Sequence, residues 1–363
     1  MNGAQSLVRT LVGCGVDVCF MNPGTSEMHF VATLDAVPEM RGVLTLFEGV
    51  ATGAADGYGR MAGRPAATLL HLGPGLGNGV ANLHNARRAR TPIVNVVGDH
   101  ATYHKKFDAP LESDIEGIAR NVSPGFVRWG TAPETLGADT VQAYRAALGP
   151  PGQVATIVVP ADVSWGPGGV VAPAPFPPQR PSVDAARVTM VADVLRSGAP
   201  AALLLGNGAF GDDGIAAAGR VAHATGAKLF GETFPARIQR GAGIRSVERI
   251  AYLGEMAATQ LEGLRHLVLV DAKPPVSFFA YPERPSWLVP DGCEVHVLSG
   301  PADDTPATLE ALVEELGAAG ADPGPAVALR PELPSGELTA GAVGQAIGAL
   351  MPDCAIVSDE SNT

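Results

Sequence analysis

The feature that most restricts the fold of this chain is a regular alternation between short, continuous apolar runs and amphipathic segments. In the first part of the chain, the apolar runs predict strands at 18–21, 43–46, 66–70, 93–97 and 154–159. The periodic segments between them predict helices at 3–14, 28–36, 49–61 and 78–89. Strands that are apolar throughout are buried on both faces. The pattern therefore predicts an α/β fold, a parallel sheet with helices on both sides.

The same alternation returns after a proline-rich break. Strands are predicted at 201–205, 227–230, 266–270 and 294–298, with a helix at 214–225; after a second break come a helix at 339–350 and a strand at 355–358. A chain of 363 residues is long enough for two or three domains. We therefore expect domains at 1–166, 186–316 and 336–363, joined by linkers at 167–185 and 317–335. Because one helix and one strand cannot bury a core, the last segment is expected to be only the start of a third α/β domain.

Charge and composition exclude several classes of protein. With 25 Lys and Arg against 37 Asp and Glu, the net charge is −12, which disfavours nucleic-acid binding. No uncharged apolar stretch is long enough to span a membrane, and the N-terminus has no signal-peptide pattern, so we expect a soluble, cytoplasmic protein. The four cysteines (Cys14, Cys19, Cys293 and Cys354) have no metal-binding spacing; they are expected to be reduced, buried thiols, and no metal ligands are predicted.

An acidic residue lies where the second predicted strand ends. Glu48 precedes a helix rich in glycine and alanine that leads to Gly57-Tyr58-Gly59-Arg60. Ligands of parallel sheets bind at the carboxyl ends of the strands. Between small neighbours the Glu48 carboxylate should be partly desolvated and suited to hydrogen-bond a protonatable ring nitrogen. The alternative from the residues alone is a carboxylate that only interacts with the helix dipole.

Two further loops should reach the same edge of the sheet. The first, 22–27, contains Pro23, Gly24 and Thr25, and the second, 71–78, begins at His71 and contains several glycines. Glycines let the backbone approach a ligand closely. Taken alone, His71 could equally be structural, and Gly73 to Gly77 could be a simple turn.

These three loops, in this order and spacing, resemble the pyrimidine-binding domain of thiamine-diphosphate enzymes, with acetolactate synthase and benzoylformate decarboxylase as the nearest kin. The resemblance extends over a Rossmann-like middle domain to the opening of the diphosphate domain. It implies catalytic roles for Glu48, His71 and Thr25. It implies cofactor contacts by the following residues: Pro23, Gly24, Glu48, Gly73, Pro74, Gly75 and Asn78.

The resemblance also implies a reaction. Glu48 would contact N1′ of the aminopyrimidine and favour the 4′-imino tautomer, which deprotonates C2 of the thiazolium. A 2-oxo acid would then lose CO2 while the cofactor ring accepts the electrons. The implied function is decarboxylation or carboligation of a 2-oxo acid by a homodimer or homotetramer, since active sites of the family lie between two subunits.

The residues that distinguish the two related families match each of them only in part. Thr25 and His71 match a benzoylformate-decarboxylase-like enzyme, but a second histidine expected near Ala280 is absent. The acetolactate synthase loop Asp-Ala-Phe-Gln-Glu corresponds here to 108–112, where the Asp, Ala and Glu remain and the Phe and Gln are replaced. Aromatic residues at 278–281 could form a pocket wall or simply pack together.

Other functions are left open by two features. Gly206-Asn207-Gly208-Ala209-Phe210-Gly211, with Glu232 further along, is a passable dinucleotide fingerprint, although a purely structural loop is the preferred interpretation. An FAD- or NAD-linked oxidoreductase is therefore a second hypothesis, in which FAD is favoured over NAD. The Gly-Asp-Gly motif and later Asn that hold Mg²⁺ in the family do not occur, although 359–363 resembles the first loop of the diphosphate domain. Mg²⁺ binding is therefore assigned to a missing C-terminal domain, and a non-catalytic relative is a third hypothesis.

Overall fold

The computed structural model describes residues 1–176 and 178–359 and contains two parallel sheets. The first has the strand order β2-β1-β3-β4-β6-β5, and every neighbouring pair is parallel. Its strands are β1 (Val18–Asn22), β2 (Arg41–Leu44), β3 (Ala66–Leu70), β4 (Ile93–Asp99), β5 (Val127–Trp129) and β6 (Val154–Pro160). The predicted α/β class is confirmed.

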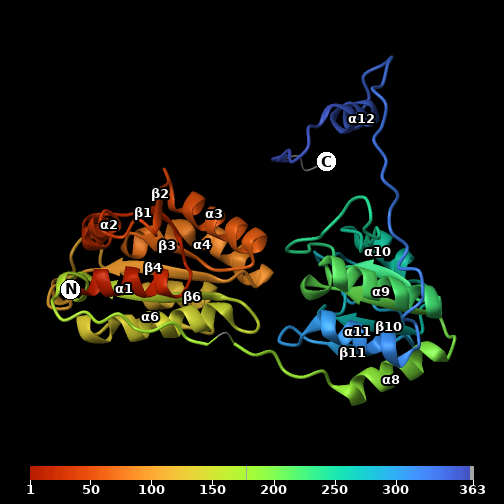
Figure 1. Cartoon of the computed structure of the whole chain (residues 1–363), viewed down its shortest axis with the longest axis horizontal. Coiled ribbons are helices and arrows are strands. Elements are labelled where there is room, and N and C mark those ends of the chain that lie inside the picture. The colour runs from red at the N-terminus through yellow and green to blue at the C-terminus, as the bar shows by residue number, and fades with distance from the viewer. Residues whose placement is uncertain (177, 360–363) are drawn as a thin grey trace.

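Helices cover both faces of this sheet (Figure 1). Successive strand residues supply the two cores: Leu69 and Val96 join the core under α1 and α6, and Leu70 and Val97 join the core under α3, α4 and α5. The helices of this unit are α1 (Gly3–Gly13), α2 (Met28–Leu34), α3 (Glu48–Ala62), α4 (Leu72–Ala89), α5 (Ile115–Val122), α6 (Pro133–Leu148) and α7 (Ala161–Trp165). Burial of strand side chains on both faces explains why these strands lack polar alternation.

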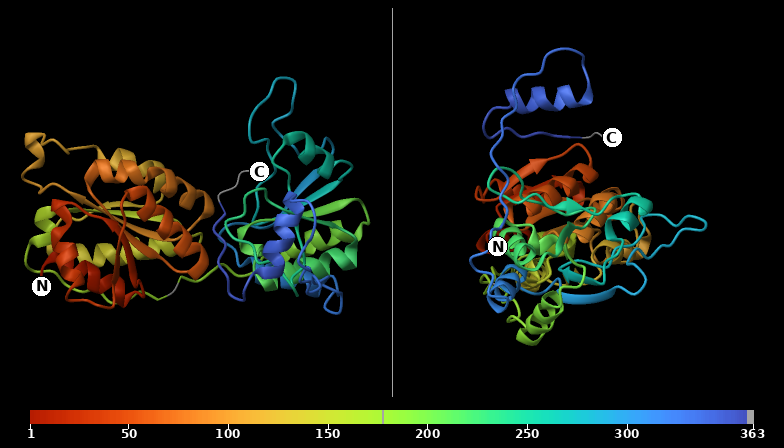
Figure 2. Two further views of the ribbon diagram at one scale, coloured as in Figure 1. Left: turned by 90° about the horizontal axis from the view of Figure 1, so that it is seen from above. Right: turned by 90° about the vertical axis from the view of Figure 1, so that its right-hand side faces the viewer.

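The second sheet has the order β11-β10-β7-β8-β9, again with parallel neighbours. Its strands are β7 (Ala201–Leu205), β8 (Lys228–Gly231), β9 (Glu248–Arg249), β10 (His266–Val270) and β11 (Glu294–Ser299). Helices α8 (Ala185–Arg196), α9 (Asp212–Thr225) and α11 (Thr305–Glu315) supply the core on one face, and α10 (Gly254–Leu261) packs on the other. The two units lie side by side, joined by an extended proline-rich segment (Figure 2).

Several predicted elements differ from the structure. The strand predicted at 43–46 lies at Arg41–Leu44, and the helix predicted at 78–89 begins at Leu72. The helices described that were not predicted are α5, α6, α7, α8, α10 and α11. Residues 355–358 form no strand, because no strand of either sheet lies beside them to accept their hydrogen bonds. The loop predicted to follow this strand, 359–363, lies outside the described residues from position 360 onward. The domain boundaries remain predictions.

The last helix, α12 (Ala340–Leu350), stands apart from both sheets (Figures 1 and 2). It has no buried residue, and Leu338 and Leu350 are largely exposed. Of the four cysteines, Cys14 and Cys19 are buried as predicted, whereas Cys293 is half-buried and Cys354 is exposed; all are free thiols. Among the helices that the structure describes, none combines the length and apolar character needed to cross a bilayer.

Candidate active site at the carboxyl edge of the first sheet

Three neighbouring strands end together at one edge of the first sheet. Register pairs Met21 with Leu44 and Asn22 with Leu70, so β2, β1 and β3 end at the same level. The segments that follow them carry the predicted site residues. The sequence prediction that these loops meet at one edge is therefore correct in its topology.

Glu48 is the first residue of α3, and its side chain is nearly buried. The amide Nδ2 of Asn78 on α4 donates a 3.0 Å hydrogen bond to its Oε2. A Cβ at position 75 would lie 3.2 Å from Glu48 Oε1 and 3.3 Å from the Cβ of His71. The absence of a side chain at Gly75 therefore leaves open the space between the carboxylate and the histidine.

His71 lies directly after β3, at the start of α4, and its ring contacts a second carboxylate. Its Nδ1 lies 2.8 Å from Oε2 of Glu27, and the same oxygen accepts a 2.7 Å hydrogen bond from the backbone N–H of Gly24. A side chain at position 24 would collide with the His71 ring. Gly24 thus lets the first loop lie directly against the imidazole, which leaves the Nε2 of His71 to face other partners.

Glu27 is a site residue that the sequence analysis did not single out. Its side chain is 1% exposed, and its Oε1 is buried with no hydrogen-bond partner among the described residues. Burial raises the pKa of Glu27, against the lowering effects of the Gly24 N–H and of His71. The only signal in the sequence was an acidic residue three positions after Gly24, a spacing that also suits a simple helix cap.

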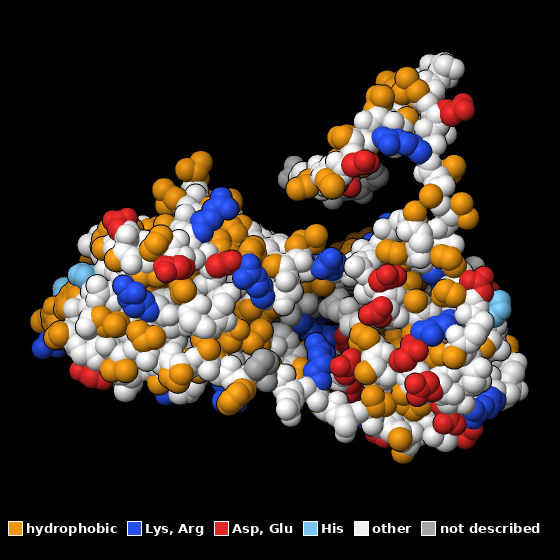
Figure 3. Space-filling view, in the orientation of Figure 1, with side chains coloured by type: hydrophobic (Ala, Val, Ile, Leu, Met, Phe, Trp, Pro, Cys, Tyr) orange, Lys and Arg blue, Asp and Glu red, His pale blue; other side chains and the backbone are white. Residues whose placement is uncertain are grey.

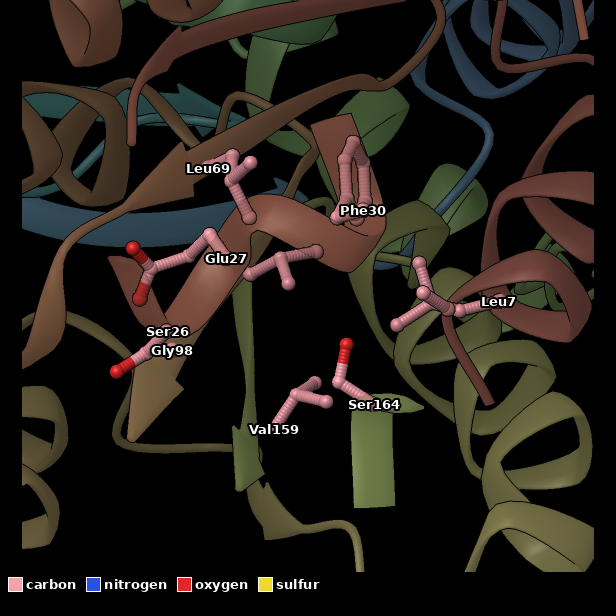
Figure 4. Close-up of a pocket in the computed structure, with 10 residues that line it drawn as sticks. Leu7, Ser26, Glu27, Phe30, Leu69, Gly98, Val159 and Ser164 are labelled. Carbon is pink, nitrogen blue, oxygen red and sulfur yellow. The ribbon is translucent and has the colours of Figure 1, made fainter. Parts of the chain in front are cut away.

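A small cavity lies beside Glu27 (Figure 4). Glu27 and Ser26 lie on one side of it, and apolar side chains, Leu7 and Phe30 among them, line the other. It leaves about 10 Å³ for the centre of a water molecule, close to the minimum for one water.

The loop predicted at 71–78 is helical, because α4 begins directly after His71. The turn is made by Leu72, which is fully buried and has a positive φ of 50°. A buried leucine in the left-handed region is strained, and such strain persists where the surrounding packing fixes it. This sharp turn aims the first turn of α4 at Glu48 and His71.

The remaining predicted residues are placed as follows. Thr25 is exposed and follows Gly24; Pro74 and Asn78 are exposed on α4, and Pro23 is half-buried. Gly73 does not face Glu48: a side chain there would collide with Ser113, so this glycine lets the segment before α5 pack on α4. The structure therefore brings together Gly24, Glu48, His71, Gly75 and Asn78, and assigns Gly73 a packing role.

Two ion pairs lie at the carboxyl end of β4. The ammonium of Lys105 lies 2.8 Å from Asp99 Oδ2 and 2.7 Å from Glu112 Oε1. Burial raises the pKa of Asp99, although Lys105 opposes this shift. Lys105 thus anchors Glu112 of the 108–112 loop to the sheet.

Comparison with known proteins decides the family. The model of the "Thiamine pyrophosphate enzyme, N-terminal TPP binding domain" matches residues 1–119. The "Putative acetolactate synthase large subunit IlvX" of Mycobacterium tuberculosis is 60% identical over the whole chain, which spans 69% of that protein. The chain belongs to the thiamine-diphosphate-dependent enzymes of the acetolactate synthase type. A benzoylformate decarboxylase of Pseudomonas aeruginosa is 30% identical over 41% of this chain and 28% of that protein.

A solved structure supports the fold of this thiamine-diphosphate-dependent family member. The thiamine diphosphate-dependent 4-hydroxybenzoylformate decarboxylase of Rhodococcus jostii RHA1 superposes with a TM-score of 0.75. The match covers 93% of this chain and 66% of that one at 21% identity. It confirms the fold and, at this identity, carries no information on substrate.

The residues at the sheet edge fit the aminopyrimidine end of thiamine diphosphate. Glu48 has one oxygen held by Asn78 and the other beside the open space at Gly75, which is the arrangement required to hydrogen-bond a ring nitrogen. The carboxylate is nearly buried, so such a bond would form largely shielded from water.

The glycines in the first loop of the middle unit are packed closely against other parts of that unit. A side chain at Gly206 would collide with the backbone of Asp271, and one at Gly208 would lie 2.9 Å from Thr305 Oγ1. These glycines are used for packing within the chain, and the known relatives do not support FAD. The aromatic residues Phe278 and Phe279 pack on each other, and Phe278 also packs on Phe234 and Tyr252.

Proposed function

We propose that this protein acts in the thiamine-diphosphate-dependent decarboxylation or carboligation of a 2-oxo acid, in the manner of acetolactate synthase. The observation that carries the proposal is the placement of Glu48 and His71 on either side of the open space at Gly75. Thiamine diphosphate supplies the electron sink for loss of CO2. The chain itself supplies groups that bind, orient and exchange protons at that edge.

In this proposal, Glu48 Oε1 exchanges a proton with the pyrimidine ring nitrogen, and Asn78 fixes the position of the carboxylate through Oε2. Burial at the start of α3 keeps water from competing for that hydrogen bond. Gly24, Pro23, Pro74 and Gly75 provide the walls that contact the cofactor. Mg²⁺ is proposed to bind with the diphosphate and not at these residues, because they offer one carboxylate where a hard cation prefers six or more oxygen ligands.

His71 is proposed to exchange a proton with the substrate through Nε2. Glu27 orients the ring by holding Nδ1, and the Gly24 N–H holds Glu27 in turn. Thr25, which is exposed in the loop that contains Gly24, is proposed to contact the substrate. A positioned imidazole of this kind contributes roughly 10²–10⁴-fold to a proton-transfer step.

A second candidate is simple decarboxylation, as the Pseudomonas relative's name describes for benzoylformate. It is favoured by the His71–Glu27 pair, because release of an aldehyde requires a proton at the carbon that carried CO2. Carboligation requires a second carbonyl compound at that carbon in place of the proton. The two candidates therefore differ in what His71 must do.

A second subunit is proposed to cover the site. Leu46 is 98% exposed immediately before the site, and Leu44, Phe47 and Val50 around it are also exposed. Apolar side chains protrude above β2 in the space-filling view (Figure 3). Exposed apolar patches of this kind mark protein contacts, and a homodimer or homotetramer would bury this one beside Glu48.

Turnover of two substrates tests the proposal. The protein, supplied with thiamine diphosphate and Mg²⁺, is offered pyruvate and benzoylformate, and CO2 and the organic product are identified. An acetohydroxy acid supports carboligation and an aldehyde supports decarboxylation. Tight binding of thiamine diphosphate without CO2 release from either 2-oxo acid would indicate a non-catalytic family member. A flavin absorbance without thiamine binding would favour the oxidoreductase.

A further inference from the structure

Two histidines and a glutamate gather at the end of the second sheet that is remote from its strand-end loops. His266 is the first residue of β10, and Glu294 is the first residue of the neighbouring edge strand β11. These two residues are directly paired in register, and His296 pairs with Val268 two residues further along each strand. Since residues two apart share a face, the three side chains project from the same face of the sheet.

The potential ligand atoms converge. His266 Nδ1 lies 3.1 Å from His296 Nε2, and Glu294 Oε2 lies 3.9 Å from the former and 3.8 Å from the latter. In a tetrahedral zinc site with bonds of about 2.0–2.1 Å, ligand atoms are separated by about 3.4 Å. Each separation is therefore within about half an ångström of a coordinated arrangement, and rotation of the exposed Glu294 side chain could close the difference.

The electrostatics also suit a cation. Both imidazoles are largely buried, at 18% and 13% exposed, whereas Glu294 is 72% exposed. The buried rings are held in place by the two strands, whereas the exposed carboxylate is free to rotate toward them. The Glu294 carboxylate lies within 4 Å of both rings and supplies the negative charge that a divalent ion requires.

We propose that His266, Glu294 and His296 form a binding site for a divalent transition-metal ion of the zinc class. Two imidazoles and a carboxylate are typical ligands for Zn²⁺, and three protein ligands leave a coordination position open to water or to another ligand. The ion would bridge β10 to the edge strand β11. This inference is independent of the proposed function, because the cluster lies at the amino ends of the strands. The spacing of 266, 294 and 296 matches no sequence motif, so only the pairing of the two strands reveals the site.

Metal titration of the full chain tests the proposal. The chain without thiamine diphosphate is titrated with ZnCl2 in excess MgCl2, and CoCl2 is used as a spectroscopic probe. We expect one equivalent to bind, with the visible bands of tetrahedral cobalt and without the ultraviolet band of a cobalt–thiolate bond. His266→Gln, His296→Gln and Glu294→Gln should each weaken binding at least about tenfold, as loss of even an outer-shell partner does.

Matched variants separate this site from adventitious binding. His223→Gln removes an exposed histidine at the end of α9, and Cys293→Ser removes the thiol next to Glu294; both should bind as the parent does. Glu294 is exposed, so its variant should fold even if a histidine variant does not. Absence of stoichiometric Zn²⁺ binding, binding that survives in Glu294→Gln and in both histidine variants, or a thiolate band would each overturn the proposal. In that case the two imidazoles simply share a hydrogen bond.

Discussion

Glu27 and His71, 44 residues apart in sequence, form a hydrogen-bonded pair in which Glu27 Oε2 lies 2.8 Å from Nδ1 of His71. The carboxylate is almost fully buried, and its second oxygen has no partner among the described residues. Burying a carboxylate so incompletely satisfied costs folding free energy. A cost of this kind at the edge where Glu48 lies is expected where function, and not stability, maintains the residue.

The first prediction separates the contribution of Glu27 to turnover from its cost to stability. Glu27→Gln should lower kcat by about ten- to a thousandfold, because the amide orients His71 less well; a full acid–base role accounts for roughly 10²–10⁴-fold. Burial raises the pKa of Glu27, so the native protein loses stability as pH rises above the unfolded value of about 4.3. The variant should therefore unfold at higher urea concentration at pH 8. Unchanged turnover would remove Glu27 from the site.

The second prediction uses the close approach of Gly24 to His71. Gly24 has a φ of −120°, so alanine is tolerated by the backbone and only the contact with the ring is changed. Gly24→Ala should displace His71 from Glu27 and lower kcat at least about tenfold, within the range of an acid–base group. As a control, a side chain at Gly57 in α3 would meet no atom within 4 Å. Gly57→Ala should leave turnover unchanged and stabilise the helix by about 0.5–1 kcal/mol. Equal turnover in the two variants would contradict the proposed role of His71.

The third prediction concerns Glu48. Glu48→Gln keeps the shape of the side chain and an acceptor oxygen but cannot exchange a proton. Hydrogen–deuterium exchange at the thiazolium C2 of thiamine diphosphate, measured with the protein, should slow by about 10²–10⁴-fold. Glu116→Gln, which alters a helix-surface carboxylate paired with Arg120, is the control and should exchange at the native rate. If Glu48→Gln exchanges as fast as the control, another group activates the cofactor.

Strands were the most predictable part of the fold. Those at 66–70, 201–205 and 266–270 have the predicted bounds, because continuous apolar runs flanked by turn residues have few other solutions in a parallel sheet. Helix α6 was missed because its buried face is built largely from small residues such as Ala143 and Ala147, which give a weak periodic signal. The strand predicted at 355–358 failed because sequence cannot show whether a partner strand is present.

The candidate site was predictable where chemistry follows the ends of strands. Glu48 and His71 were found from their positions after apolar runs. Glu27 was missed because its burial depends on contacts from Gly98 on β4 and from His71, neither of which is near it in sequence. The cofactor contact of Gly73 stays a prediction. A glycine that admits a ligand and a glycine that admits a neighbouring chain segment, here Ser113, cannot be told apart from sequence.

The last prediction concerns Glu232, which follows β8 in the middle unit. Burial raises the pKa of Glu232 from 4.5 to about 7, although Arg90 opposes the shift. The folded state holds the Glu232 proton to higher pH than the unfolded state does. The contribution of this proton to the free energy of unfolding is therefore fully present below about pH 4.5 and is lost as pH rises to about 7. Glu232→Gln removes this loss. Its advantage in free energy of unfolding should grow between those pH values to at most about 3 kcal/mol and then remain constant. Denaturant unfolding across that range measures it, with Glu314→Gln, an exposed charge on α11, as the control for net charge. A difference from the native protein that does not vary with pH would mean that Glu232 is ionised in the folded state throughout, held by Arg90 and its neighbours.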